Sequence, residues 1–240
     1  MKYLIIVCLL LFTLKILAQD TLSCNCIKQL DENYTPKLQG QVYRGLAGMV
    51  GSDFFTPEYL KGDIYLENGE ISYDQQLRYN GRIDGLVLTP PNSSKEILLE
   101  KYFIKAFCLK KFKGNADIKF EKIKIHNELR NDSSSIFGQV LYQNKLSLYA
   151  YRRFDLQDVS DIAEGKQVVR KLYTPSFTYY FRLPDNTTIG FKSLKKRNLY
   201  KVFPANKDLM RKIFREKHLR RFLNEEDLIQ LTEGLNSLYN

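Results

Sequence analysis

The sequence is poor in the residues most often used for catalysis. Its 240 residues include two histidines, His126 and His218, and neither has a His, Cys or carboxylate at metal-ligand spacing. The sequence also contains no Gly-x-Ser-x-Gly elbow whose serine His126 could activate as a general base. The glycines of segment 40–51 are followed by no lysine and match no phosphate-binding fingerprint. We therefore expect no catalytic residue, no bound metal and no cofactor.

The carboxylates of segment 58–79 do not indicate a glycosidase. They alternate with apolar residues, as on the solvent-facing side of a strand, whereas a glycosidase needs two of them roughly 5–10 Å apart in a cleft. The carboxylates considered are those of the central hairpin, Asp63, Glu67, Glu70 and Asp74. A hydrolase with an unrecognised site is kept only as a third hypothesis for the function.

Cysteine is sparse as well. Cys8 lies in the apolar N-terminal run, which leaves Cys24, Cys26 and Cys108 in the rest of the chain. One disulfide from Cys108 to Cys24 or Cys26 would leave one free thiol, and the alternative is a buried Cys108 with two unpaired tail thiols. Two cysteines at C-x-C spacing without a second ligand pair do not make a zinc site.

Long apolar runs are absent apart from the N-terminus, where residues 1–18 predict a secretory signal peptide. Lys2 supplies the positive start, residues 3–14 are apolar but short for a bilayer span, and Ala18 offers a small residue for cleavage. A retained membrane anchor and a lipoprotein site at Cys24 are the alternatives. We expect an exported protein that is periplasmic, outer-membrane associated or extracellular, with no transmembrane helix in the mature chain.

Acidic residues are outnumbered, with 27 Asp and Glu against 37 Lys and Arg, which gives a net charge of +10. Loss of Lys2 and Lys15 with the signal peptide lowers this value to +8. Because the protein is exported, we expect no nucleic-acid partner. Anionic envelope lipid or polysaccharide, or another envelope protein, is the expected partner class.

What the sequence does contain is the alternation of apolar and polar residues that is typical of β-strands. Tyr (16) and Phe (15) are plentiful while Trp is absent, a composition that favours strands. In segment 58–79, Ile64 and Leu66 alternate with polar neighbours, and we expect Ile71, Tyr73, Leu77 and Tyr79 to share one face of the next strand. Asn68-Gly69 between them predicts a hairpin with a type I′ turn, in which both central residues have positive φ.

Similar strands continue to residue 191 without intervening helices. They are predicted at 41–44, 85–89, 96–99, 103–109, 117–125, 136–142, 145–154, 167–173, 177–183 and 188–191, with 167–173 and 177–183 forming a hairpin of their own. The fold class we expect is α+β and mainly antiparallel β, a meander that curls into a sandwich or a partly open barrel over residues 39–191. Residues 19–38 are polar and aperiodic, and we expect an extended leader.

The period changes to that of helices in residues 192–240. We predict that Ser193 caps a helix that ends before Pro204. We also predict that Asn206 caps a second helix, which runs to about Leu219. Asn224, followed by three acidic residues, is predicted to cap a third helix. We expect these short helices to pack on the β domain.

This C-terminal segment is strongly basic. Its cations are Lys192, Lys195, Lys196, Arg197, Lys201, Lys207, Arg211, Lys212, Arg215, Lys217, Arg220 and Arg221, with only Asp208 and Glu216 between them. Lys207, Arg211 and Arg215 recur every four residues and share one helix face. We expect this face, with Lys212, to be the candidate anion-binding site. The alternative is a solvated face balanced by acids elsewhere, such as those at 225–227.

Several short motifs resemble an uncharacterised family of exported proteins from Gram-negative bacteria. The shared elements are the entry at residues 51–55 (GSDFF), the hairpin at 62–69 (GDIYLENG) and the turn at 78–80 (RYN). Towards the C-terminus, Tyr179-Tyr180, the Val-Phe-Pro at 202–204 and the Asn-Glu-Glu-Asp-Leu-Ile at 224–229 are also similar. The resemblance implies a β-rich architecture and export, and it assigns no catalytic residue or ligand.

Two binding hypotheses follow from these features. The first is a non-enzymatic structural or binding module of the cell envelope. The second is an electrostatic binder of anionic lipid or polysaccharide that acts through the basic C-terminal helices.

Overall fold

The computed structural model describes residues 37–91, 93–110, 116–127, 132–163 and 166–239. The predicted signal peptide, most of the predicted leader, and Cys24 and Cys26 lie outside these residues. The described part is mainly antiparallel β-sheet with a few short C-terminal helices, which confirms the expected fold class at that level.

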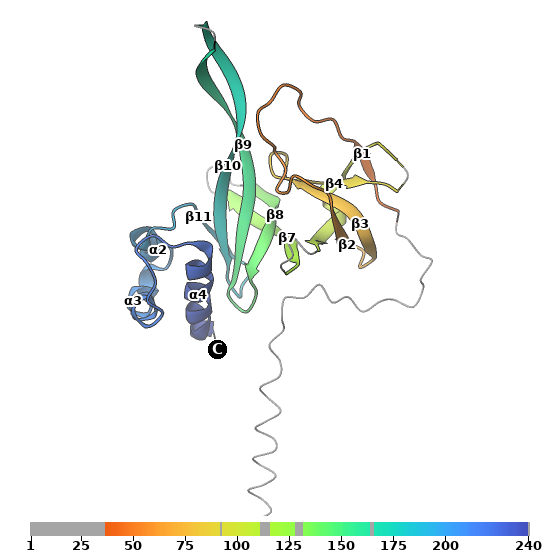
Figure 1. Cartoon of the computed structure of the whole chain (residues 1–240). Coiled ribbons are helices and arrows are strands. Elements are labelled where there is room, and N and C mark those ends of the chain that lie inside the picture. The colour runs from red at the N-terminus through yellow and green to blue at the C-terminus, as the bar shows by residue number, and fades with distance from the viewer. Residues whose placement is uncertain (1–36, 92, 111–115, 128–131, 164–165, 240) are drawn as a thin grey trace, which may run out of the picture.

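The strands form a single antiparallel sheet of 11 strands in the order β1-β5-β4-β3-β2-β6-β7-β8-β9-β10-β11 (Figure 1). Their bounds are β1 Gly40–Val42, β2 Leu60–Leu66, β3 Ile71–Asn80, β4 Gly85–Thr89, β5 Ile97–Leu99, β6 Ile104–Leu109, β7 Ile118–Asn127, β8 Asp132–Tyr142, β9 Ser147–Ala163, β10 Lys166–Arg182 and β11 Thr188–Phe191. The sheet bends so that the turn between β3 and β4 meets strands far along this order. The Phe137 N–H of β8 donates to Asp84 Oδ1 (3.1 Å), and the Phe154 N–H of β9 donates to the Gly81 carbonyl (3.4 Å).

The hairpin of β2 and β3 is present, but its turn is not type I′. Gly69 has φ 89°, whereas Asn68 is not among the residues with positive φ. The Gly69 N–H donates to the Leu66 carbonyl (3.1 Å), and the Leu66 N–H donates to the Glu70 carbonyl (2.9 Å). These bonds close a three-residue loop with Gly69 in the left-handed position, the other common hairpin solution. The Asn-Gly pair located the turn correctly but not its type.

A bulge in β3 also changes which residues face the core. Gly62 pairs with Gln75 but Ile64 pairs with Ser72, so one extra residue lies between them on β3, where Asp74 has φ 52°. Ser72, rather than Ile71 or Tyr73, therefore lies opposite Ile64. Asp63 is 2% exposed and forms an ion pair with Lys110 (2.7 Å), so our prediction that it faces solvent was wrong.

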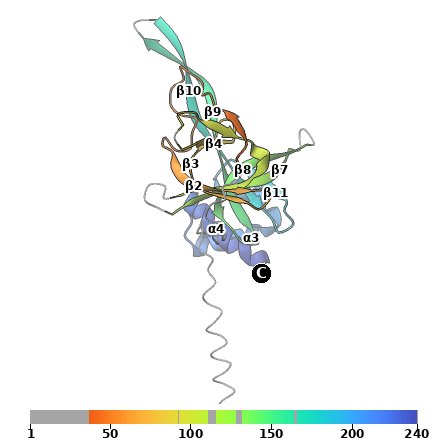
Figure 2. The same ribbon diagram turned by 90° about the vertical axis from the view of Figure 1, so that its right-hand side faces the viewer.

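The predicted hairpin at 167–183 is a second correction. Those residues form one strand, β10, which pairs with β9 over its whole length of 17 residues. Pro175 interrupts the sequence pattern but not the ladder. The Tyr173 N–H donates to the Val50 carbonyl (3.1 Å) on the side away from β9, and Pro175, two residues further on, has the same orientation. The missing N–H of Pro175 therefore removes no bond to β9. Figures 1 and 2 show this β9–β10 ribbon extending beyond the rest of the sheet, on the side opposite the helices.

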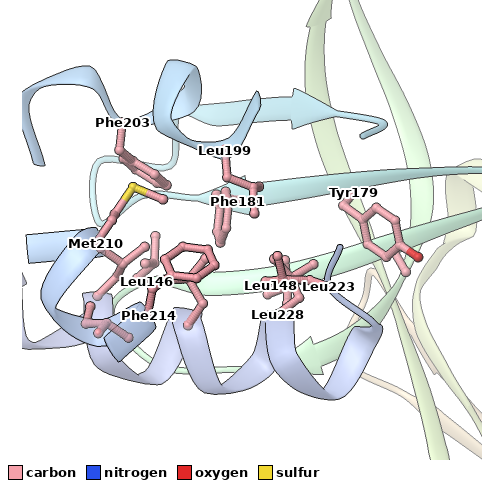
Figure 3. Packing of buried hydrophobic residues seen from close by; sticks show 14 residues of the cluster. Leu146, Leu148, Tyr179, Phe181, Leu199, Phe203, Met210, Phe214, Leu223 and Leu228 are labelled. Carbon is pink, nitrogen blue, oxygen red and sulfur yellow. The ribbon is translucent and has the colours of Figure 1, made fainter. Parts of the chain in front are cut away.

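The helices cover the β9–β11 end of the sheet. Among the described residues they are α2 (Lys196–Val202), α3 (Lys207–Glu216) and α4 (Glu225–Asn236), with the 3-10 turns η3 (Pro204–Asn206) and η4 (Ser237–Tyr239). A further 3-10 turn, η1 (Lys101–Phe103), lies between β5 and β6. Figure 3 shows Leu146, Leu148 and Phe181 of the sheet side packed against Met210, Phe214 and Leu228 of the helices. This helix–sheet core is separate from the core of the first strands, which is built around Tyr79, Phe107, Phe120 and Phe137.

Two of the three predicted cap residues, Asn206 and Asn224, occupy N-cap positions, and Asn224 forms the expected side-chain bonds. Asn224 accepts a hydrogen bond from the Asp227 N–H (2.7 Å), and Asp227 accepts one from the Asn224 N–H (3.2 Å), which together form a capping box. Asn206 occupies the predicted N-cap position of α3, but its side chain makes no capping bond. The prediction for Ser193 was wrong, because α2 begins at Lys196 with Lys195 as its N-cap residue.

Candidate anion-binding surface

The basic residues of segment 192–221 are nearly all at the surface. The apolar side of α3, formed by Met210, Ile213 and Phe214, is buried in the helix–sheet core, where α3 packs on α4. An amphipathic helix fixed in this way must turn its other side to solvent. The exposed cations are Lys192, Lys195, Arg197, Lys201, Lys207, Arg211, Lys212, Arg215, Lys217, Arg220 and Arg221, and Lys196 is half-buried.

The four predicted anion-binding residues lie together on the exposed side of α3, but two of them already have partners. Arg211 forms an ion pair with Asp208 (2.9 Å), and Lys212 lies 3.8 Å from Glu216. Both pairs are well exposed, so each is expected to be weak. Lys207 and Arg215 form no ion pair among the described residues, and the Lys207 ammonium lies 5.9 Å from the centre of the Tyr200 ring.

Two of the three acids expected to balance this charge, Glu225 and Asp227, are engaged elsewhere, whereas Glu233 of α4 lies 3.5 Å from Lys217 of the basic run. Glu225 binds Arg152 through both carboxylate oxygens (2.5 and 2.8 Å) and accepts a hydrogen bond from the Tyr179 hydroxyl (2.8 Å). Asp227 is part of the capping box of α4. Glu225 and Asp227 are therefore bound to partners outside the basic run, and they do not neutralise it.

A second group of cations is assembled by backbone pairing that the sequence did not reveal. Lys195 forms an isolated antiparallel bridge with Phe222. The Lys196 N–H donates to the Arg221 carbonyl (3.0 Å), and the Leu223 N–H donates to the Leu194 carbonyl (3.0 Å). This short two-stranded contact brings Arg221 beside the start of α2.

The result is a shallow hollow, widely open to solvent, with a volume of about 430 Å³ and cations along its sides. Its lining residues are Lys196, Arg197, Tyr200, Leu219 and Arg221, and we call it the basic hollow. Among the described residues, none of these three cations forms an ion pair with a carboxylate. The hollow is therefore a concentration of positive charge without an internal counter-ion.

Aromatic rings hold several of these cations in place. The Lys196 ammonium lies 4.3 Å from the centre of the Phe214 ring. At the rim, Phe222 is 58% exposed, and both Lys195 (5.5 Å) and Arg221 (5.8 Å) lie over its ring. Cation–π contacts of this kind orient a cation and leave its charge available to an anion. Alternation of Phe and Tyr with the basic residues was the sequence signal for this arrangement, but the partner segments could not be paired from it.

The buried carboxylates do not form a comparable site. Asp84 accepts hydrogen bonds from the Tyr79 hydroxyl (2.7 Å) and the Phe137 N–H, and pairs with Lys101. Burial raises the pKa of Asp84, and the Lys101 charge offsets this only in part. Asp63 and Asp74, two members of the carboxylate set considered for a glycosidase, both bind Lys110 (2.7 and 2.8 Å). These contacts link strands to one another. The other two members of the set, Glu67 and Glu70, line a separate hollow of about 200 Å³ with Glu100, and Glu67 pairs with Lys122 (2.5 Å).

The remaining predicted residues can be placed only in part. His218 is exposed beyond the end of α3, with φ 51°. His126 lies in β7, and its side chain is outside the described part of the structure. Cys108 is buried in β6 and is disulfide-bonded. Because Cys24 and Cys26 lie outside the described residues, the pairing of Cys108 with one of them stays a prediction. No group of three potential metal ligands occurs among the residues described.

Comparison with known proteins gives no further guide to function. No family model, no curated protein and no solved structure matches this chain. Within the described part of the chain, no helix is both long enough and apolar enough to cross a membrane.

Proposed function

We propose that this protein is an exported, non-enzymatic binding module of the cell envelope that attaches to anionic lipid or polysaccharide through its basic C-terminal surface. The observation that carries this proposal is the exposed cationic surface of α2, α3 and segment 217–221, on which the hollow's three cations have no carboxylate partner among the described residues. Each Lys or Arg held near an anionic membrane contributes on the order of 1 kcal/mol.

Export is supported by the signal-peptide pattern of residues 1–18 and by the resemblance to exported proteins of Gram-negative bacteria. A location in the periplasm, at the outer membrane or outside the cell is consistent with this route. The internal partners of Asp63 and Asp84 support the view that the protein has no reaction centre built from these groups.

The sheet would serve as the scaffold for this surface. The contacts of the β3–β4 turn with β8 and β9 support a curl into a partly open barrel. In that arrangement the helices are held by the β9–β11 end, and their basic sides point away from the sheet.

A co-sedimentation panel tests the proposal. The purified exported protein is mixed with phosphatidylglycerol vesicles, with phosphatidylcholine vesicles, and separately with an acidic and a neutral polysaccharide resin. We expect retention on at least one anionic support and none on the neutral supports. Release is expected in roughly 1 M salt, where the screening length falls to ~3 Å. Absence of retention on both anionic supports at low salt would remove the proposal.

A further inference from the structure

We infer that the basic hollow binds the phosphate of an anionic phospholipid headgroup at a bilayer surface, with the Phe222 ring entering the interface beside it. This inference rests on the proposed function and names the ligand class and the place of contact within the larger basic surface. The observation that points to it is the juxtaposition of Lys196, Arg197 and Arg221 around one hollow, next to an exposed aromatic ring.

The composition of the hollow suits a phosphate. Arg197 and Arg221 present planar guanidinium groups, which can bind phosphate oxygens through two parallel hydrogen bonds. Lys196 adds a point charge, and Tyr200, whose side chain carries a neutral hydroxyl donor, also lines the hollow. Because the bridge between Lys195 and Phe222 fixes the two segments relative to each other, the backbone positions that carry these donors are set before the ligand binds.

The rim of the hollow favours a lipid over a sugar polymer. Sugars stack on aromatic rings and are usually held there by polar groups that bind their hydroxyls, whereas the exposed Phe222 ring carries no polar atom and has two cations, Lys195 (5.5 Å) and Arg221 (5.8 Å), beside it. What remains is an exposed apolar ring surrounded by cations. Surfaces that lie in the headgroup region of a membrane combine apolar aromatic side chains with Lys and Arg in this way.

Three charge-matched variants separate the hollow from the rest of the surface. The hollow variant is Lys196→Gln/Arg197→Gln/Arg221→Gln, and the outer-face variant is Lys207→Gln/Arg211→Gln/Arg215→Gln. The control variant, Lys61→Gln/Lys105→Gln/Lys124→Gln, removes three exposed lysines from the strands. All three variants lose the same net charge, so a purely global charge effect would weaken them equally.

Affinity for phosphatidylglycerol vesicles is then measured by co-sedimentation. We expect the hollow variant to lose at least about tenfold in affinity, since three lipid-facing cations are removed, whereas the outer-face variant loses roughly threefold and the control less. Equal losses in the hollow and outer-face variants would overturn the inference while leaving the proposed function in place. Failure of the wild-type protein to bind any anionic support would remove both.

The hollow variant must be shown to fold, because Lys196 contacts Phe214 of the helix–sheet core. Its thermal unfolding is compared with that of the wild type. The double variant Arg197→Gln/Arg221→Gln keeps Lys196 and both side chains are exposed, so it repeats the test without touching that core. We expect this double variant to lose at least about fivefold in affinity, and an affinity equal to that of the wild type would contradict the inference.

Phe222→Trp distinguishes a bilayer from a polysaccharide. The chain contains no Trp, so the introduced indole is the only one and reports the environment of that position. We expect a blue shift of its emission on phosphatidylglycerol vesicles and quenching by brominated lipid. Binding to an acidic polysaccharide, without blue shift or quenching on vesicles, would overturn the lipid assignment and leave the proposed function standing.

Discussion

At the residue scale, Arg152 and Glu225 form an ion pair that joins the start of α4 to the sheet, at the edge of the helix–sheet core. The Arg152 side chain is 7% exposed, binds both oxygens of Glu225, donates from Nε to Gln139 (2.7 Å) and lies over the Phe177 ring (4.8 Å). A charge this well buried needs its partner, because an unpaired buried cation is costly. The pair therefore fixes the start of α4, and with it the orientation of the basic surface.

Replacement of Glu225 by Gln should destabilise the protein by about 2 kcal/mol. This is less than the ~3–5 kcal/mol for breaking a fully buried pair, because the Glu225 side chain is 35% exposed. Urea unfolding measures the change. Glu226→Gln, at the exposed neighbour, is the matched control and should change the free energy of unfolding by less than about 0.5 kcal/mol. Equal effects of the two substitutions would show that the Arg152 pair contributes little.

The same pair predicts a dependence of stability on pH. Burial acts to raise the pKa of Glu225, but the hydrogen bonds and charge of Arg152, helped by Tyr179, outweigh it, so the pKa lies below the ordinary 4.5. The stability from this group is present above pH 4.5 and is lost as the pH falls through the lowered pKa. Between pH 5 and about pH 3, wild-type stability should therefore fall more steeply than that of Glu225→Gln. Parallel stability curves for the two proteins would contradict this.

At the element scale, the sequence predicted positions better than connections. Period-two alternation located most strands within a few residues, because it depends on neighbours in the chain. The bulge at β3 and the single long strand β10 were missed, since each depends on a partner strand that the local pattern does not contain. The basic hollow was missed for the same reason. It depends on the pairing of residues 194–196 with residues 221–223, and these two segments are separated in the sequence by helical residues.

Gly81 shows how closely the β3–β4 turn approaches strand β9. A Cβ added at this position would lie 2.1 Å from the Arg152 carbonyl oxygen and 2.6 Å from the Phe154 ring. The β3–β4 turn can therefore meet β9 only if residue 81 has no side chain. No sequence signal distinguished this glycine from an ordinary turn residue.

Gly81→Ala should accordingly destabilise the protein by at least about 2 kcal/mol, because backbone rather than a flexible side chain must move. Gly45→Ala is the matched control, since its Cβ would meet nothing closer than 3.8 Å and its φ is not positive. That control should be neutral or slightly stabilising, within about 1 kcal/mol. Thermal and urea unfolding of both variants measure the difference. A wild-type stability for Gly81→Ala would mean that the turn and β9 do not touch.

At the scale of the whole molecule, the structure separates a scaffold from a charged surface. The carboxylates most suggestive of chemistry, Asp63 and Asp84, have internal partners in the sheet, whereas the cations collect on the helices at its β9–β11 end. This asymmetry was foreseeable from the basic run of residues 192–221. Its concentration in one hollow was not, because that requires the tertiary contact between α2 and segment 219–222.

The most direct test of the account is the affinity of the purified protein for phosphatidylglycerol vesicles as a function of salt. If the basic surface binds through charge, the dissociation constant should rise steadily between 50 mM and 1 M salt, as screening shortens the range of the interaction from roughly 14 Å to ~3 Å. Phosphatidylcholine vesicles should give no binding at any point. An affinity that stays constant across this range, or that is equal for the two lipids, would contradict the account.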